Sequence, residues 1–252
     1  MTWERTGSID PRALVDARLQ LHWVAQAVAG VGRTLHQPRA DDSHTSFTWV
    51  PALDALVQEP VDGVTCGIRP RDLTVIVIGA TASKLALHRR TLDDAFAFLE
   101  SQFGQMLKRP DVELPDHMVA RGGRFDADMT HLAELSRYYS DAALLLEDLG
   151  SVRCWPHHFD IATLIALGEG RTIGVGLSPG DAAFPEPYYY VTPWPYPDAS
   201  TLRSLQHGRW NTIGWTGAVL TATEFAQVDE QEAMVRAFIT DAMAQCREAL
   251  AP

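Results

Sequence analysis

Along the chain, stretches with helical spacing of apolar residues alternate with stretches that have the two-residue period of β-strands. The first helical stretch begins at Asp10-Pro11, because aspartate caps helices and proline fits their first turn. Its apolar side chains recur at three- and four-residue steps and predict a helix that ends near Gly30: Leu14, Ala17, Leu21, Val24, Ala25 and Val28. The same spacing predicts helices over residues 91–106, 128–149 and 229–250. Thr91 is the expected cap of the first of these.

Between the helices, short apolar segments flanked by turn residues predict strands. Four lie in the N-terminal half, over residues 45–50, 64–69, 73–79 and 84–89. Four lie in the C-terminal half, over residues 157–167, 171–178, 187–194 and 217–225. Two links, "RPRD" before Leu73 and "GEG" before Arg171, are short enough for hairpins, so neighbouring strands are expected to pair antiparallel.

Each half therefore reads as a helix, four strands and a helix, which predicts an α+β fold with antiparallel sheets covered by helices on one face. The repeated order of elements suggests an internal duplication, although residue identity between the halves is negligible. The proline- and glycine-containing link "KRPDVELPDHMVARGGRFDAD" separates an N-terminal half, 1–109, from a C-terminal half, 126–252. A single pseudo-symmetric domain over 1–252 is the alternative.

Composition narrows the class of protein. The formal net charge of −11 argues against non-specific nucleic-acid binding, which needs a basic face. No apolar run is long enough to span a membrane, and the first residues lack a signal-peptide pattern, so we expect a cytoplasmic protein with no membrane partner. The three cysteines are too few and too scattered to predict a disulfide framework or a thiolate zinc site.

The segment "CWPHHFDIAT" is the best candidate for chemistry. If a strand starts at His157, alternation places His158 and Asp160 on one face and His157 on the other. His158 and Asp160 are then the predicted catalytic pair, with the aspartate orienting the histidine as a general base. Alternatively, a divalent metal is held by four residues, His157, His158, Asp160 and Glu186. The competing interpretation is a strand start whose histidines bond to loop backbone.

A second candidate is the proline-rich segment "GLSPGDAAFPEPYYYVTPWPYP", which predicts an edge strand between stiff loops. Alternation puts Tyr188 and Tyr190 on one face and Tyr189 on the other. Aromatic side chains here could line a pocket for a flat or sugar-like ligand, or could simply fill a core. The predicted ligand-binding residues are Trp155, Asp181, Tyr188, Tyr190 and Trp194.

A weaker group precedes the first strand and consists of His36, Asp41, Asp42 and His44. It is either a solvated loop or, combined with the "HHFD" segment, part of one site. Isolated histidines, such as His22 on the first helix, are expected to be structural. The sequence lacks nucleotide-binding glycine loops, the H-E-x-x-H zinc motif and a hydrolase nucleophile elbow, so whether the protein is an enzyme stays open.

Three segments resemble those of an uncharacterised bacterial family of unknown function: the helix "LQLHWVAQAVAGV", the strand "HFDIA" and the stretch "PEPYYYVTPWP". In that family a similar helix, an F-D-L-A strand and a P-E-P…Y-Y stretch follow in the same order. The aromatic run before F-D in the family differs from "CWPHH" here, which would make the double histidine a subgroup feature. The family has no established activity, so the resemblance implies no catalytic residue.

These observations favour a protein or enzyme that binds a small molecule between the "WPHHFD" strand and the "PEPYYYVTPWP" segment. A divalent metal there would make the protein hydrolase-like. The competing class is a non-catalytic structural or interaction protein, a homodimer joined through strand edges or helices, in which the same residues serve the core.

Overall fold

The chain folds into two compact units, each assembled from segments that are separated in sequence. A computed structural model describes residues 2–111 and 113–251. The first unit consists of Ala13–Ser136 with Arg153–Phe159, and the second of Met1–Arg12, Arg137–Val152 and Asp160–Pro252. The helix α3, Met129–Leu146, contributes residues to both. The predicted halves are continuous in sequence, whereas these units are not.

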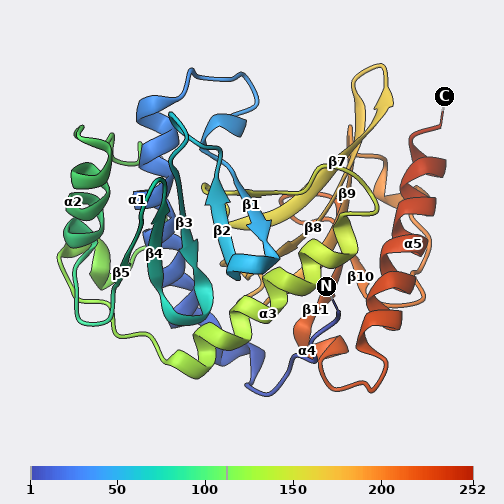
Figure 1. Ribbon diagram of the computed structural model, residues 1–252. Coiled ribbons are helices and arrows are strands. Elements are labelled where there is room, and N and C mark those ends of the chain that lie inside the picture. Colours follow the sequence, from blue (N-terminus) through green and yellow to red (C-terminus); the bar gives the residue numbers. More distant parts are fainter. Residues whose placement is uncertain (1, 112, 252) are drawn as a thin grey trace. The chain divides into compact units, whose positions relative to one another are not determined.

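The first unit contains a six-stranded antiparallel sheet in the part of the chain that the structure describes. The strands follow the order β6 (Arg153–Trp155), β1 (Phe47–Val50), β2 (Ala55–Gln58), β3 (Thr65–Arg69), β4 (Thr74–Ile78) and β5 (Ala82–Ala86). Its long helices are α1, Val15–Leu35, and α2, Leu92–Phe103 (Figure 1).

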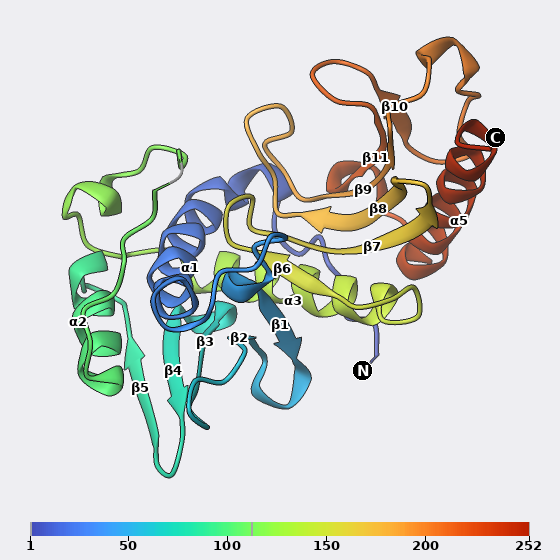
Figure 2. The ribbon, with the colours of Figure 1, turned by 90° about the horizontal axis from the view of Figure 1, so that it is seen from above.

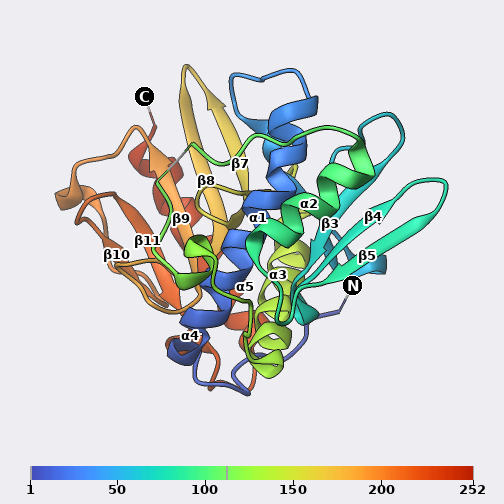
Figure 3. The ribbon, with the colours of Figure 1, turned by 90° about the vertical axis from the view of Figure 1, so that its left-hand side faces the viewer.

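One face of this sheet forms the core of the first unit. Trp49, Leu56, Ile68 and Val75 are aligned across β1 to β4 and are all buried. Both helices pack against the strands, and Figures 2 and 3 show α1 and α2 as neighbours. Because strand side chains alternate, the odd positions of β1 face the helices and the even positions face away from them.

The second unit contains a five-stranded antiparallel sheet among its described residues. The order is β10 (Arg209–Asn211), β11 (Gly217–Thr221), β9 (Tyr188–Trp194), β8 (Arg171–Ser178) and β7 (Asp160–Gly168). The short α4, Ala222–Phe225, and the long α5, Gln231–Ala249, follow β11 (Figure 1). The buried residues Leu177, Tyr189 and Leu220 form a row on the face that α5 covers.

Short 3-10 turns connect several elements: Pro11–Leu14, Ser43–Thr45, Pro51–Leu53, Pro70–Asp72, Met118–Arg121 and Ala199–Thr201.

No helix in the described part of the chain is long and apolar enough to cross a membrane.

The α+β class with antiparallel sheets is confirmed, and so are several local predictions. Thr91 caps α2 in a capping box with Asp94. The "RPRD" link joins β3 and β4 through a 3-10 turn, and Leu73 after it takes a left-handed conformation. The "GEG" link joins β7 and β8 in a hairpin. Each of these signals depends on residues within a few positions of one another.

Other boundaries were wrong for identifiable reasons. The first helix continues through Gly30 and Gly32 to Leu35. Those glycines serve close packing instead of ending the helix, since a Cβ on Gly30 would lie 3.1 Å from the carbonyl oxygen of Lys108. The predicted strand 217–225 ends at Thr221, which forms a capping box with Glu224 and starts α4.

The strand predictions also missed three strands and misplaced two. β2 lies between two prolines, and β6 and β10 are short, so none shows a clear two-residue pattern. The strand predicted over 84–89 is β5 at Ala82–Ala86. The strand predicted over 157–167 is β7, which starts only at Asp160, because residues 156–159 form a turn.

Candidate functional site

The two adjacent histidines lie in a turn, which overturns the alternation argument. Residues 156–159 are turn residues, and Phe159 has a φ of 59°, in the left-handed region. Both imidazoles are exposed, and their ring centroids lie 4.5 Å apart. The prediction that His157 and His158 point to opposite faces of a strand is therefore wrong, since strand alternation does not apply inside a turn.

Two side chains of helix α1 contact this turn. His22 Nε2 lies 2.8 Å from the Pro156 carbonyl oxygen, and the side-chain amide of Gln26 donates to the same oxygen. The His22 ring also stacks on Phe159, with centroids 5.4 Å apart and planes 9° from parallel. Since a carbonyl only accepts, His22 carries its proton on Nε2. Its role is structural, as the sequence indicated.

The burial of His22 makes the stability of the first unit dependent on pH. Burial lowers the pKa of His22 from 6.5 to about 4, and the nearby Arg18 and other histidines act in the same direction. The unfolded chain takes up a proton below pH 6.5 that the folded chain takes up only near pH 4. We therefore expect the free energy of unfolding to fall as the pH drops through this window, by at most about 3 kcal/mol.

Urea denaturation between pH 4 and 7.5 measures this effect. The variant His22→Gln should show a flatter dependence on pH, whereas the exposed His88→Gln should retain the wild-type slope. An unchanged slope in His22→Gln would show that another group titrates.

Asp160 and His158, the predicted catalytic pair, belong to different units. Asp160 begins β7 and accepts a hydrogen bond from the hydroxyl of Tyr190 on β9. Gly176 lies between these strands, and a Cβ there would approach the Tyr190 hydroxyl to 2.7 Å. The glycine thus lets the phenol lie across β8, and the pairing of Asp160 with His158 stays a prediction.

The two loop carboxylates each have local partners in the second unit. Glu186 is buried, accepts from the Thr223 backbone N–H at 2.6 Å and lies 3.5 Å from Arg12 Nε. Asp181 accepts from the Tyr188 hydroxyl at 2.6 Å and from two backbone N–H groups. Burial and the hydrogen bond to Asp181 raise the pKa of Tyr188.

The predicted metal set gains no support from the geometry. Within residues 2–111 and 113–251, no group of three His, Cys, Asp or Glu side chains could hold a metal ion. A divalent metal on His157, His158, Asp160 and Glu186 therefore stays a prediction.

The predicted aromatic residues form clusters within their units. The Tyr188 ring lies 6.2 Å from that of Tyr190 and 5.0 Å from that of Phe184. Tyr189 lies on the opposite face from these two tyrosines, as alternation predicted, and is fully buried. Trp194 is 55% exposed and contacts Tyr196 edge-on. Trp155 belongs to the first unit, where its ring lies 6.3 Å from that of His157.

A pocket in the first unit unites the two histidine-bearing segments that the sequence singled out. It has a volume of about 430 Å³ and is lined by Gln26, Arg33, Asp42, His44, Thr45, Asp111, Pro156 and His157. We call it the polar pocket. The turn that carries His157 and the loop that carries His44 thus line one cavity, which is the combination expected if the two segments formed one site.

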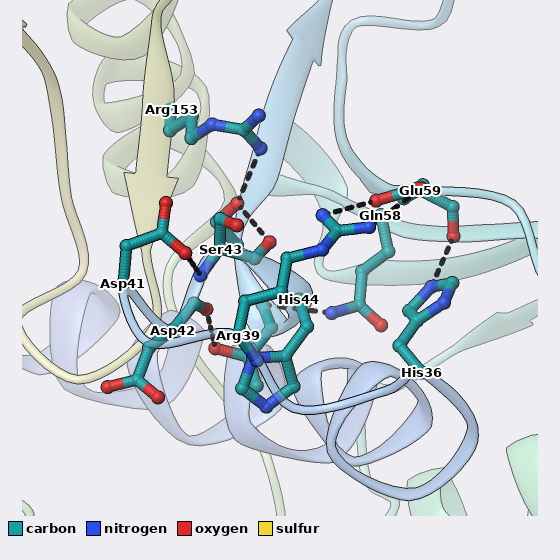
Figure 4. A network of polar contacts seen from close by, with 11 residues as sticks. His36, Arg39, Asp41, Asp42, Ser43, His44, Gln58, Glu59 and Arg153 are labelled. Atoms are coloured by element: carbon teal, nitrogen blue, oxygen red, sulfur yellow. Dashed lines mark hydrogen bonds and ion pairs between the residues drawn. The ribbon is translucent and has the colours of Figure 1, made fainter.

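The buried Gln58 positions the loop on one side of the polar pocket. Its amide accepts from the Gly32 backbone N–H at 3.0 Å and donates to the Thr45 carbonyl at 2.9 Å. Figure 4 shows this loop between Arg153 and Glu59, with His36 and Arg39 both directed at Glu59. Gln58 therefore ties the loop to α1 and to β2 together.

Two pocket residues present hydrogen-bond donors. His44 is buried, and its Nδ1 accepts from the Arg39 backbone N–H at 3.3 Å, so the neutral ring carries its proton on Nε2. Arg33 donates to the Lys108 carbonyl and to Gln26 Oε1, each at 3.3 Å. A guanidinium has five N–H donors, so Arg33 keeps donors for a ligand.

Charges of both signs line the polar pocket. Burial lowers the pKa of Arg33, and the nearby Asp111 counteracts this effect, but the guanidinium remains a cation. Asp42 and Asp111 add carboxylates. Such a pocket can bind a small polar molecule through Arg33 and His44 and offers His157 as an exposed imidazole. Sequence reasoning did not identify Arg33, Gln26 or Gln58 as site residues. An arginine or glutamine in an amphipathic segment cannot be distinguished by pattern from one that is simply exposed to solvent.

Comparisons of the chain with protein-family models, curated proteins and solved structures found no significant match. The resemblance to an uncharacterised bacterial family stays a prediction.

Proposed function

We propose that the first unit binds a small zwitterion, such as a free amino acid, in the polar pocket. The observation that carries this proposal is that Arg33, His44 and His157 line one cavity of about 430 Å³ together with two carboxylates. Arg33 would take the ligand's carboxylate in a bidentate contact, and Asp42 or Asp111 its ammonium group. Those carboxylates would repel a purely anionic ligand, and Arg33 would repel a purely cationic one.

Titration calorimetry with the free amino acids tests this proposal. We expect one or more of them to bind, and we expect Arg33→Gln to weaken that binding at least tenfold, because it removes a charge-assisted contact worth about 1.5 kcal/mol or more. His157→Ala should weaken binding less, since His157 is exposed. The exposed residues of the same unit provide matched controls, Arg90→Gln and His88→Ala, which should leave the affinity unchanged. Wild-type affinity in Arg33→Gln would contradict the proposal.

The sequence also predicted contributions from His158, Asp160 and the "PEPYYYVTPWP" segment, and a divalent metal. Metal analysis of protein purified without chelators, followed by His158→Ala, tests these. We also propose, as the sequence predicted, that the protein is cytoplasmic. We likewise retain the internal duplication as a hypothesis, supported by the order α1, strands, α2 in one half of the chain and α3, strands, α5 in the other.

A non-catalytic interaction protein is the second candidate function, and one observation favours it. The open face of β7, β8 and β9 carries the exposed Leu164 and Trp194, at 70% and 55% exposure. Exposed apolar side chains that share one face often mark a protein interface. Sedimentation velocity at increasing concentration tests whether this face joins two copies into a homodimer.

A further inference from the structure

The face of the first sheet that points away from α1 and α2 carries a second and larger pocket. It has a volume of about 710 Å³, within the range of about 300–1,000 Å³ that is usual for small-molecule sites. We call it the sheet-face pocket. It shares no lining residue with the polar pocket.

The floor of the sheet-face pocket is apolar. Ala55, Val57 and Ile76 form a small buried cluster, and Val50 and Ile78 pack against it. Val57, Gly67 and Ile76 are aligned across β2, β3 and β4. A Cβ at Gly67 would lie 2.8 Å from Val57 Cγ1, so glycine keeps the side chains on the floor apart. An alkyl chain can lie over these apolar side chains, between Thr48 and Thr65, which also line the pocket.

The rim of the sheet-face pocket is charged and includes two arginines, Arg39 and Arg153. Arg39 pairs with Glu59 at 2.8 Å. Arg153 is half-buried and donates to Ser46 Oγ at 3.1 Å, and no ion pair includes it among the residues that the structure describes. Ser46 in turn donates to the Ser43 carbonyl at 2.8 Å, which holds the guanidinium at the rim (Figure 4).

We propose that the sheet-face pocket binds an amphipathic carboxylate, with its carboxylate on Arg153 and its alkyl chain over Val50, Val57 and Ile78. The planar guanidinium matches a carboxylate in a bidentate contact and keeps enough donors for one. Asp41 and Glu59 are close enough to interact electrostatically with Arg153. They make a dianionic phosphate less favourable than a monoanion. The ligand class is therefore a medium-chain fatty acid.

Titration calorimetry of the full chain with octanoate tests this proposal, with acetate and octanamide as comparison probes. Octanoate should bind at least tenfold more tightly than acetate, which lacks the alkyl chain, and than octanamide, which lacks the charge. Arg153→Gln should weaken octanoate binding at least tenfold and remove the preference over octanamide. Arg153→Lys should retain part of that preference, because the charge remains.

A second pair of variants guards against effects on folding. Thr48 is exposed on the same face and adjoins Arg153 in the register of β1 and β6. Thr48→Glu places a carboxylate beside Arg153 and should abolish octanoate binding, whereas the uncharged Thr48→Gln should reduce it at most threefold. Arg33→Gln, in the polar pocket, should leave octanoate binding unchanged, so this result and that of the amino-acid titration are independent. Octanoate binding that is absent, or unaffected by both Arg153→Gln and Thr48→Glu, would overturn the proposal.

Discussion

Asp141→Asn is expected to raise the free energy of unfolding by about 2 kcal/mol at pH 8 and to lower it by about 1 kcal/mol near pH 4. Asp141 is 1% exposed in α3; its Oδ1 accepts from the Glu4 backbone N–H at 2.8 Å, and its Oδ2 is buried without a hydrogen-bond partner. Burial is the main cause that raises the pKa of Asp141 to about 8, and the charges of Glu4 and Glu232 act in the same direction.

The sign of this effect follows from proton binding. Between pH 4 and pH 8 the folded chain holds a proton on Asp141 that the unfolded chain has released. Stability contributed by this group is therefore present at low pH and is lost as the pH rises through that window, by at most about 1.4 kcal/mol per pH unit. Asparagine cannot ionise, so it removes this loss at high pH. Its buried amide hydrogens need acceptors, which costs about 1–3 kcal/mol at every pH and makes the variant less stable than wild type near pH 4.

Urea denaturation of both proteins from pH 4 to pH 9 measures the difference. Asp148, exposed after the same helix, is the matched control, and Asp148→Asn should reproduce the wild-type curve. A wild-type slope in Asp141→Asn would assign the dependence on pH to another group.

Gly32→Ala is expected to lower the free energy of unfolding by about 2 kcal/mol, although alanine normally favours a helix by about 1 kcal/mol over glycine. A Cβ at Gly32 would overlap the His44 carbonyl oxygen and lie 2.9 Å from Gln58 Nε2. The backbone carbonyl of His44 cannot move away from the added Cβ as easily as the end of a flexible side chain could. The loop that carries His44 and Thr45 must therefore move, and the polar pocket should lose ligand affinity as well.

Gly30→Ala provides the comparison, because Gly30 lies on the same helix but has more space. Its Cβ would lie 3.1 Å from the Lys108 carbonyl oxygen and 3.3 Å from Phe96. We expect a smaller loss of stability there and no loss of ligand affinity. Thermal denaturation and titration of both variants measure these differences. Equal stability of Gly32→Ala and wild type would mean that the loop yields without cost.

Much of the secondary structure could be predicted because its signals are local. The capping box of Thr91 and Asp94 joins residues three positions apart, and "RPRD" bends the chain within four residues. The α+β class likewise followed from the two periods of apolar residues. The missed strand β2 shows the limit, since its four residues are all buried and show no alternation.

The candidate site was only partly visible in the sequence. His157, His44 and Asp42 were singled out, and all three line the polar pocket. Arg33 and Arg153 were not, because the importance of each depends on a segment at least 75 positions away along the chain. His22 illustrates the same limit: its partner, the Pro156 carbonyl, is 134 positions along the chain.

By itself, the sequence determined the helical and strand periods, the antiparallel hairpins and the presence of histidines in two polar segments. Only the tertiary structure decided that residues 156–159 form a turn, that two glycines serve packing inside α1, and that Arg33 and His157 share a cavity. Periodicity and capping act within a few residues and leave a mark on the sequence. Hydrogen bonds such as those from His22 and Gln26 to Pro156 depend on which segments meet, which local pattern does not record.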